Sequence, residues 1–449
     1  TVTYGEARLF GKTYFGGASE RSLILLITEN TMGSVLTYIQ SLRHDLVPIL
    51  MDKKTNHEQL MGIIDKYRPE YAAVPEKYMM HPGKDYEEKW RSKGYIYYAR
   101  KTEEESCKLY KDLALLLSTS GSTGSPKFVK ISKMNLQSNT SSIASYLHIT
   151  EIDRPITTLP MSYTYGLSII NSHLYRGATI LLTEASVMEQ TFWDFFKKQQ
   201  ATTFGGVPYT YKMLKFIGFL DMQLPSLKIM TQAGGKLPVS LQKIFTAYGK
   251  AYDRPLIVMY GQTEATARMA YLPWKDAEQK QGSIGIAIPG GRFWLTSESV
   301  ITDSYKTGEL IYDGPNVTMG YAVDRRSLMT GDENHGRLAT GDLAYRDDDG
   351  FYYIAGRKKR FIKLLGNRIS LDETEELLNQ AFPETEFVCA GTDEQMKVFC
   401  TGDIGDEKAI ISYLSDKLHL FYKNFSVRKI KKIPRNTSGK VLYEQLEEQ

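Results

Sequence analysis

The stretch DLALLLSTSGSTGSPK occupies residues 112–127 and joins an apolar run to a loop of glycines and hydroxyls. The run DLALLLSTS at 112–120 is typical of a buried strand. In a loop that follows a strand, glycine lets the backbone approach an anion, while amides, hydroxyls and a lysine donate to its oxygens. The pattern therefore predicts a phosphate-binding loop, although GxxxxGK[ST] is absent. A flexible Ser/Gly linker is the alternative, and the preceding strand and the following Pro126-Lys127 argue against it. The loop residues are Ser118, Thr119, Ser120, Gly121, Ser122, Thr123, Gly124 and Lys127.

Strand-like and helix-like segments alternate on both sides of this loop, which predicts parallel sheets covered by helices. We expect strands at 22–27, 46–50, 70–74, 156–160, 178–183, 202–208, 227–235 and 256–259, and helices at 32–43, 57–67, 166–176 and 188–199.

From about Gly282 the strands become shorter and the turns more frequent, which indicates a small β-rich unit. The last part of the chain predicts a compact α+β unit, with a hairpin before a helix at 371–381, strands at 385–391 and 396–401, a helix at 406–418 and a strand near 426–430. The expected fold is α/β, with a large N-terminal domain of stacked mixed sheets and helices and a small mobile α+β C-terminal domain. We expect the first domain at 1–358, with its β-rich subdomain at about 282–358, and the second at 359–449.

Composition narrows the class of protein. Of the 449 residues, 42% are hydrophobic and 24% charged, as in soluble globular proteins. The net charge of +4 is too small to argue for nucleic acid, and no apolar run approaches a membrane span. Three scattered cysteines and the lack of a signal peptide indicate a cytoplasmic protein.

A second motif, YGQTEAT at 260–266, follows the apolar run LIVM. Glu264 offers the carboxylate oxygen that Mg²⁺ prefers, Thr263 can donate to a phosphate, and Tyr260 can stack on a base. Taken alone, a strand-end turn with a surface glutamate explains the motif better.

Two further segments carry candidate polar residues. In ATGDLAYRDDDGFYYIAGRKKR at 339–360, Asp342 can accept hydrogen bonds from ribose hydroxyls and Arg357 can donate to the sugar or a phosphate. We interpret Asp347–Asp349 as a hairpin turn ended by Gly350, not as a metal site. In IPRNTSGKVLY at 433–443, Lys440 follows Ser438-Gly439, and by itself it would be a solvated charge.

The order of STSGSTGSPK, AGG, YGQTE, TGD, GRKKRFIK and NTSGK resembles the adenylate-forming superfamily of acyl-CoA synthetases, peptide-synthetase adenylation domains and luciferases. The resemblance covers nearly the whole chain and implies a stand-alone member with a short N-terminus. It implies that Thr119–Gly124 and Lys127 grip pyrophosphate, and that Lys440 bridges the acid and the α-phosphate. The other implied roles are adenine contacts for Gly234, Gly235, Tyr260 and Gly261, α-phosphate and Mg²⁺ contacts for Thr263 and Glu264, ribose contacts for Asp342 and Arg357, the hinge for Lys359 and the thiol tunnel for Gly366.

The acid pocket is expected from the resemblance at PMSYTYG, 160–166, and TTFGGVP, 202–208. Tyr163 stands where many acyl-CoA synthetases have His and amino-acid-activating domains have Asp, which disfavours an ordinary α-amino acid. Other departures are Phe128 after Lys127, and Tyr443 in place of an arginine. An aromatic pocket with few charges favours a neutral acyl or aryl acid. The expected lining residues are Tyr163, Tyr165, Phe204, Gly205, Gly206, Val207 and Tyr209, each of which could equally be plain core.

These patterns predict an ATP- and Mg²⁺-dependent acid–thiol ligase that forms acyl-AMP, releases pyrophosphate and passes the acyl group to coenzyme A or to the phosphopantetheine of a carrier protein. One alternative is an adenylating enzyme that serves a carrier protein or an amine without coenzyme A. A catalytically silent nucleotide-binding protein of the same fold is the other. The acid substrate and the acceptor stay open at this point.

Overall fold

The structure is a computed structural model that describes residues 1–78, 81–101, 108–118, 127–296, 300–302, 305–358, 360–364, 367–392, 394–402, 407–418, 420–436 and 439–446. The chain forms two compact units. The first unit comprises Thr1–Arg292 and Asp313–Leu338, and the second comprises Phe293–Tyr312 and Ala339–Gln449.

An eight-stranded sheet begins the first unit. Strand β1 is buried throughout and pairs in parallel with β2 on one side and β3 on the other. Such two-sided burial explains why its sequence, LILLIT, is apolar without alternation. The strand order is β17-β7-β6-β2-β1-β3-β5-β4. The bounds are β1 Leu23–Thr28, β2 Val47–Asp52, β3 Tyr71–Pro75, β4 Tyr86–Ser92, β5 Tyr95–Arg100, β6 Leu113–Ser118, β7 Phe128–Ser132 and β17 Tyr321–Ala322.

A second sheet of six strands has the order β13-β12-β11-β10-β9-β8. Its neighbours β9, β10 and β11 are parallel, so their carboxyl ends lie at one edge. The bounds are β8 Pro155–Ile156, β9 Thr203–Gly206, β10 Ile229–Gln232, β11 Leu256–Tyr260, β12 Ala270–Tyr271 and β13 Ile286–Ala287.

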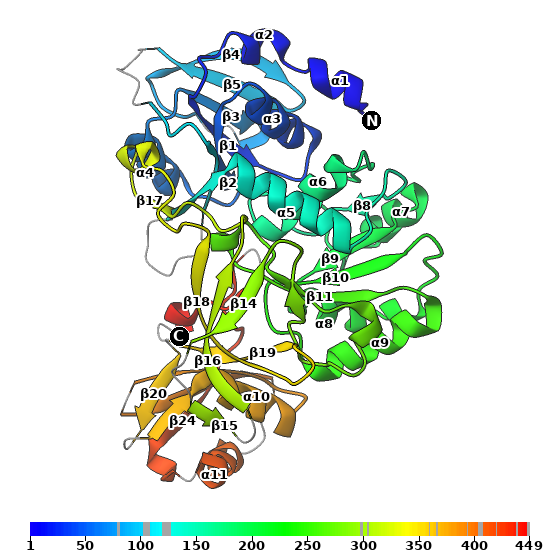
Figure 1. Ribbon diagram of the computed structural model, residues 1–449, viewed down its shortest axis with the longest axis vertical. Coiled ribbons are helices and arrows are strands. Elements are labelled where there is room, and N and C mark those ends of the chain that lie inside the picture. The colour runs from blue at the N-terminus through cyan, green and yellow to red at the C-terminus, as the bar shows by residue number, and fades with distance from the viewer. Residues whose placement is uncertain are drawn as a thin grey trace. The chain divides into compact units, whose positions relative to one another are not determined.

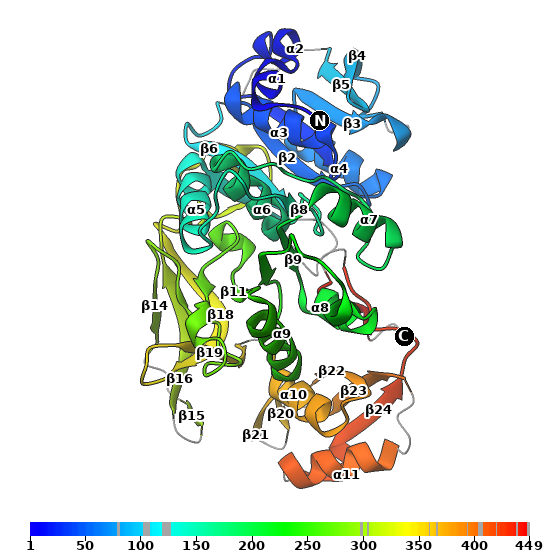
Figure 2. The same cartoon turned by 90° about the vertical axis from the view of Figure 1, so that its right-hand side faces the viewer.

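Helices α5 and α6 lie between these two sheets, as both views of the ribbon show (Figures 1 and 2). Leu167 and Ile170 of α6 pack in the core of the first sheet, whereas Tyr165 and Ile169 of the same helix pack in the core of the second. The helix is therefore apolar on two faces. The helices of this unit are α1 Tyr4–Leu9, α2 Lys12–Gly16, α3 Met32–Arg43, α4 His57–Tyr67, α5 Lys133–Tyr146, α6 Thr164–Tyr175, α7 Gln190–Gln199, α8 Pro208–Phe216 and α9 Val239–Tyr252.

The second unit holds three smaller sheets. One has the order β14-β16-β18-β19, with β15 paired to β16; the others are the hairpin β20-β21 and the sheet β22-β23-β24. The strands are β14 Arg292–Leu295, β15 Val300–Thr302, β16 Tyr305–Asp313, β18 Arg337–Arg346, β19 Tyr352–Arg357, β20 Phe361–Leu364, β21 Asn367–Ser370, β22 Glu386–Gly391, β23 Met396–Thr401 and β24 Phe425–Lys429, and the helices are α10 Leu371–Ala381 and α11 Glu407–Leu418.

The predicted fold class is confirmed by this mixture of stacked sheets and helices. The expected strand at 178–183 is wrong, because only Leu181 forms a bridge, to Ile156 of the two-residue strand β8. The segment Phe293–Tyr312 groups with the second unit because β16 pairs with β14 and lies beside β18. The domain boundary at Lys359 stays a prediction, since that residue lies outside the described part of the chain. No helix in the described ranges has the length and apolarity to span a membrane.

Leu25 and Leu9 offer a test of where the core of the first unit lies. Leu25 is fully buried in β1, whereas Leu9 is 66% exposed at the end of α1. Leu25→Ala leaves a cavity, so we expect it to lower the free energy of unfolding by about 2–5 kcal/mol. Leu9→Ala should change it by less than about 0.5 kcal/mol. Urea titration followed by circular dichroism measures both, and equal effects would contradict this assignment of the core.

Candidate functional site

Three of the predicted motifs meet at one edge of the second sheet. Gly205 and Gly206 end β9, Gly234 and Gly235 follow β10, and Tyr260 ends β11. Because the three strands are parallel neighbours, these segments are adjacent at the carboxyl edge. In open α/β sheets this edge is where ligands bind.

The glycines at this edge make room for aromatic side chains. A Cβ on Gly234, whose φ is +82°, would lie 2.5 Å from Oη of Tyr163 and 3.1 Å from Val207. A Cβ on Gly205 would lie 2.8 Å from Oη of Tyr165. The resemblance implied the acid pocket for Tyr163, Tyr165 and Gly205 and an adenine contact for Gly234, and the structure brings these four residues together.

Tyr163 and Tyr165 flank the start of α6, with ring centroids 6.4 Å apart. Tyr165 is buried, and its hydroxyl lies 2.8 Å from that of Thr231 on β10. Tyr163 is only partly buried, and burial raises its pKa to about 12, so the hydroxyl is neutral at pH 7. The wall formed by the two rings is aromatic and uncharged.

Val207 also borders Gly234, whereas Phe204 and Tyr209 lie elsewhere. Phe204 points to the opposite face of β9, where its ring packs near Tyr211 and Phe219. This placement favours core packing for Phe204. Tyr209 lies on α8 with 44% of its surface exposed.

The YGQTEAT motif forms a tight turn after β11. A Cβ on Gly261 would overlap the carbonyl oxygen of Ala267, so only glycine fits. Thr263 and Glu264 lie in the single helical turn Thr263–Ala265 that follows, and the Thr263 hydroxyl lies 3.4 Å from that of Thr164 at the start of α6. The turn thus holds Thr263 beside the wall that carries Tyr163.

Glu264 is held by a residue that sequence reasoning did not select. The Tyr321 hydroxyl donates to Oε1 of Glu264 at 2.6 Å, and the Thr318 amide donates to the Glu264 carbonyl at 2.9 Å. Burial raises the pKa of Tyr321, and the neighbouring carboxylate raises it further. In the sequence, Tyr321 follows Met319-Gly320, and that pair by itself predicts a turn and no functional role for the tyrosine.

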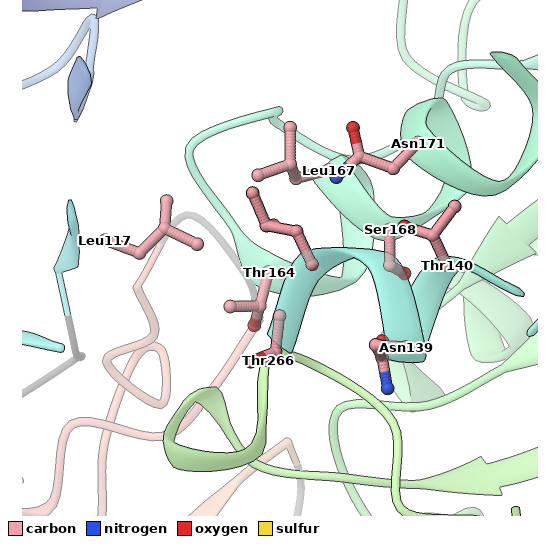
Figure 3. A pocket seen from close by; sticks show the side chains of 9 residues that line it. Leu117, Asn139, Thr140, Thr164, Leu167, Ser168, Asn171 and Thr266 are labelled. Carbon is pink, nitrogen blue, oxygen red and sulfur yellow. The ribbon is translucent and has the colours of Figure 1, made fainter. Parts of the chain in front are cut away.

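A small cavity lies behind this turn, between α5 and α6 (Figure 3). Its volume is about 10 Å³, and polar side chains gather on its helical walls. A drug-sized ligand pocket spans about 300–1,000 Å³, so this hollow suits water better than an acid substrate. The residues that line it are Leu117, Leu136, Asn139, Thr140, Thr164, Leu167, Ser168, Asn171 and Thr266.

Several predicted residues belong to the second unit. Asp342 on β18 lies opposite Arg357 on β19, and the two side chains form an ion pair of 3.0 Å. Asp342 is almost fully buried, whereas about half of the Arg357 side chain is exposed. The Asp347–Gly350 turn joins these strands, as expected, with the Gly350 amide donating to the Asp347 carbonyl.

Lys440 is exposed, and its backbone pairs with Asn436 to close a short loop. Its amide donates to the Asn436 side chain and its carbonyl accepts from the Asn436 amide, both at 2.9 Å. Arg435 holds the base of this loop through the Gly439 carbonyl, at 2.7 Å. The loop therefore presents the lysine at the surface of the second unit.

The described residues do not include every predicted one. Lys127 is exposed directly before β7, at the described end of the phosphate loop. Ser118, also predicted in this loop, is the last residue of β6. The remaining loop residues lie outside the described part of the chain, as do the expected hinge and thiol-tunnel residues: Thr119, Ser120, Gly121, Ser122, Thr123, Gly124, Lys359 and Gly366.

A family model described as "AMP-binding enzyme" matches residues 20–322. The matched part contains both stacked sheets and the turn that carries Glu264. The chain therefore belongs to the AMP-binding enzyme family, which confirms the resemblance to adenylate-forming proteins.

Curated relatives include an oxalate–CoA ligase of Arabidopsis thaliana, 29% identical over 344 residues, which are 74% of this chain and 66% of the relative. Another is a 2-succinylbenzoate–CoA ligase of Bacillus licheniformis, 27% identical over 77% of this chain and 72% of the relative. The chain spans 66%, 62% and 62% of the length of the first three curated relatives it matches.

Solved structures share the fold over the whole chain. The o-succinylbenzoate CoA synthetase of Bacillus subtilis, in complex with its acyl-adenylate intermediate, gives a TM-score of 0.77 at 20% identity over 100% of this chain and 93% of that one. ATP-bound MatB from Rhodopseudomonas palustris gives 0.76 at 20% identity over 99% and 93%.

The close approach at Gly261 gives a direct test of the turn. Gly261→Ala must displace the backbone at Ala267, so we expect it to lower the free energy of unfolding by about 1–3 kcal/mol. Gly62→Ala is the matched control, because a Cβ there meets nothing within 4 Å. It lies within α4, where alanine favours the helix. Thermal unfolding measures both, and a neutral Gly261→Ala would refute the described turn.

Proposed function

We propose that this protein is an AMP-forming acid–thiol ligase that uses MgATP to activate a carboxylic acid and then acylates coenzyme A. The observation that carries the proposal is the convergence of the Gly205, Gly234 and Glu264 segments at the carboxyl edge of the parallel strands β9, β10 and β11, within the family match. The relatives named as CoA ligases support coenzyme A as the acceptor.

In the first half-reaction a carboxylate oxygen of the acid attacks the α-phosphorus of ATP. The bond from that phosphorus to the bridging oxygen of the β-phosphate breaks, and pyrophosphate leaves. Two anions must approach each other, so cationic and hydrogen-bonding groups that stabilise the developing charge lower the barrier. We assign this role to Thr263 beside the acid wall and to Lys440 on its exposed loop.

Glu264 is suited to hold Mg²⁺ together with the nucleotide. In the described part of the chain no group of three or more His, Cys, Asp and Glu could hold a metal ion by itself. A single carboxylate oriented by Tyr321 fits Mg²⁺, which commonly binds through one or two carboxylates plus substrate phosphates. When bound, the ion would neutralise phosphate charge at the reacting end of ATP.

We assign nucleotide recognition to residues of both units. Tyr260, Gly261, Gly234 and Gly235 border the space for adenine at the edge of the second sheet. Asp342 and Arg357 are assigned to ribose, and the buried carboxylate paired with a half-exposed arginine supports this assignment. The loop from Thr119 to Lys127 is assigned to pyrophosphate.

In the second half-reaction the thiol sulfur attacks the acyl carbon, AMP leaves and the thiol proton passes to solvent. We place Lys440 at the first half-reaction only, and we assign Lys359 as the hinge and Gly366 to the thiol tunnel. A cytoplasmic location and a carrier protein as a further acceptor stay predictions.

Acid-dependent ATP–pyrophosphate exchange tests the first half-reaction. We expect exchange with at least one member of a panel of short, medium, aryl, hydroxy and amino acids. Lys440→Ala removes the assigned cation, so we expect the exchange rate to fall about 100- to 1,000-fold. Lys432→Ala is the control, because Lys432 is an exposed lysine of the same tail. Lack of exchange with every acid would refute the proposal, and acylation of coenzyme A against a phosphopantetheinylated carrier identifies the acceptor.

The Tyr321–Glu264 hydrogen bond predicts a change in Mg²⁺ dependence. Loss of a partner that orients a metal ligand typically weakens metal binding about 10- to 100-fold. We therefore expect Tyr321→Phe to raise the Mg²⁺ concentration for half-maximal exchange by about that factor, with little loss of rate at saturating Mg²⁺. Tyr175→Phe, at an exposed tyrosine of α6, is the matched control. An unchanged Mg²⁺ requirement would remove Glu264 from the proposed Mg²⁺ site.

A further inference from the structure

Arg268 is a buried cation at the acid wall that the proposed function does not use. It follows the YGQTEAT turn, and only 2% of its surface is exposed. The centre of its guanidinium lies 4.8 Å from the centroid of the Tyr165 ring. The Tyr165 hydroxyl in turn fills the space beside Gly205, where a Cβ would lie 2.8 Å from it. The positive charge is therefore inside the wall assigned to the acid.

The hydrogen bonds of this guanidinium are weak, and their acceptors are neutral. Nη1 donates to the Tyr146 hydroxyl at 3.3 Å and to the Met259 sulfur at 2.9 Å. Nε is fully buried without a hydrogen-bond partner, and no described residue accepts a hydrogen bond from Nη2. In the described ranges no carboxylate forms an ion pair with Arg268.

The groups around Arg268 do not supply a compensating negative charge. Burial raises the pKa of Tyr146 and of Tyr165, although the arginine opposes both shifts. Burial lowers the pKa of His173 to about 4, so that ring is neutral at pH 7. A buried guanidinium is costly unless it is paired, and here the protein supplies aromatic and sulfur contacts only.

The free edge of the guanidinium has the geometry of a carboxylate receptor. Nε and Nη2 lie on the same edge, which is one of the two edges that can bind a carboxylate through two parallel hydrogen bonds. Nη1, on the other side, is already engaged. The side chain thus presents its unused donors as a fork.

The backbone holds this fork in place at a conformational cost. Thr266 and Ala267, directly before Arg268, have φ of +58° and +126°. Such values are uncommon for residues other than glycine, and strain of this kind gathers at functional sites. The Arg268 carbonyl accepts from the side chains of Asn139 and Asn316, at 2.8 and 3.1 Å. These hydrogen bonds therefore hold the backbone of Arg268 in place before any ligand arrives.

We infer that Arg268 binds a second carboxylate of the acid substrate, so that the protein activates a dicarboxylic acid. One carboxylate reacts with ATP, and the other pairs with Nε and Nη2 of Arg268. This inference rests on the proposed function and narrows its substrate class. It corrects the expectation of a neutral acid, which followed from the uncharged residues visible in the pocket motifs.

Matched pairs of acids test the inference. We expect wild-type exchange with an aliphatic or aryl dicarboxylic acid to exceed exchange with its monomethyl ester about 100-fold or more in kcat/KM. Arg268→Met should reverse this preference, because the ester no longer leaves a buried charge unpaired. Arg254→Met is the control, since Arg254 also lies near tyrosine rings and donates to a tyrosine hydroxyl, but at the opposite end of β11. A wild-type protein that prefers monocarboxylic acids or esters overturns the inference and leaves the proposed function intact.

The stability of the ligand-free protein distinguishes a substrate-binding role of Arg268 from a structural role. We expect the urea midpoint of Arg268→Met to equal or exceed that of the wild type, because an uncompensated buried charge is removed. A large fall in the midpoint would assign a structural role and count against the inference.

Calorimetric titration of each dicarboxylic acid into the wild type and Arg268→Met, without ATP, gives a readout that does not depend on turnover. Binding that Arg268→Met abolishes supports the inference even if exchange fails. Equal binding to both proteins overturns it.

Discussion

The backbone crossing at Gly261 is the constraint on which the rest of the site depends. The chain leaves β11 at Tyr260 and returns so closely that the carbonyl of Ala267 fills the space of a Gly261 side chain. Within this short return lie Thr263, Glu264 and Arg268, and each faces a different partner: Thr164, Tyr321 and Tyr165. A single turn thus gathers a hydroxyl, a carboxylate and a guanidinium at the carboxyl edge of the sheet.

Much of this arrangement could be predicted from the sequence. The strands β1, β2 and β6 are continuous apolar runs because parallel strands are buried on both faces. The helices α3, α4 and α10 have the predicted bounds, and the side chains of Asn56 and Ser370 cap the last two. Glycine-rich motifs are equally readable, because the close approaches at Gly234 and Gly261 allow no other residue.

The residues that the sequence did not reveal depend on tertiary contacts. Arg268 stands in the segment ATARM, whose sequence gives no sign that the arginine side chain is buried. Its burial comes from packing against Tyr146, Tyr165 and Met259, which lie outside this segment. Tyr321 is distant in sequence from Glu264 and meets it because β17 pairs with β7. Phe204 differs from Gly205 in the face it occupies, which follows from the period of two along β9.

The proposed roles of Arg268 and Lys440 answer the same chemical requirement, which is to offset negative charge. Joining an acid to a nucleotide brings negative charges together, and a dicarboxylic acid adds another. In the proposals, Arg268 is assigned to the carboxylate that is bound and Lys440 to the carboxylate that reacts. Burying the Arg268 charge without a carboxylate among its described neighbours costs stability, and selection can retain that cost when a ligand supplies the anion.

The central claim is that a carboxylate oxygen attacks the α-phosphorus of ATP, and isotope transfer tests it most directly. The acid is labelled with ¹⁸O in both oxygens of its carboxyl groups, and the products are analysed by mass spectrometry after a complete turnover with thiol. The account predicts one ¹⁸O atom in AMP and none in pyrophosphate. Label in phosphate or pyrophosphate, or AMP formed without label, would contradict it.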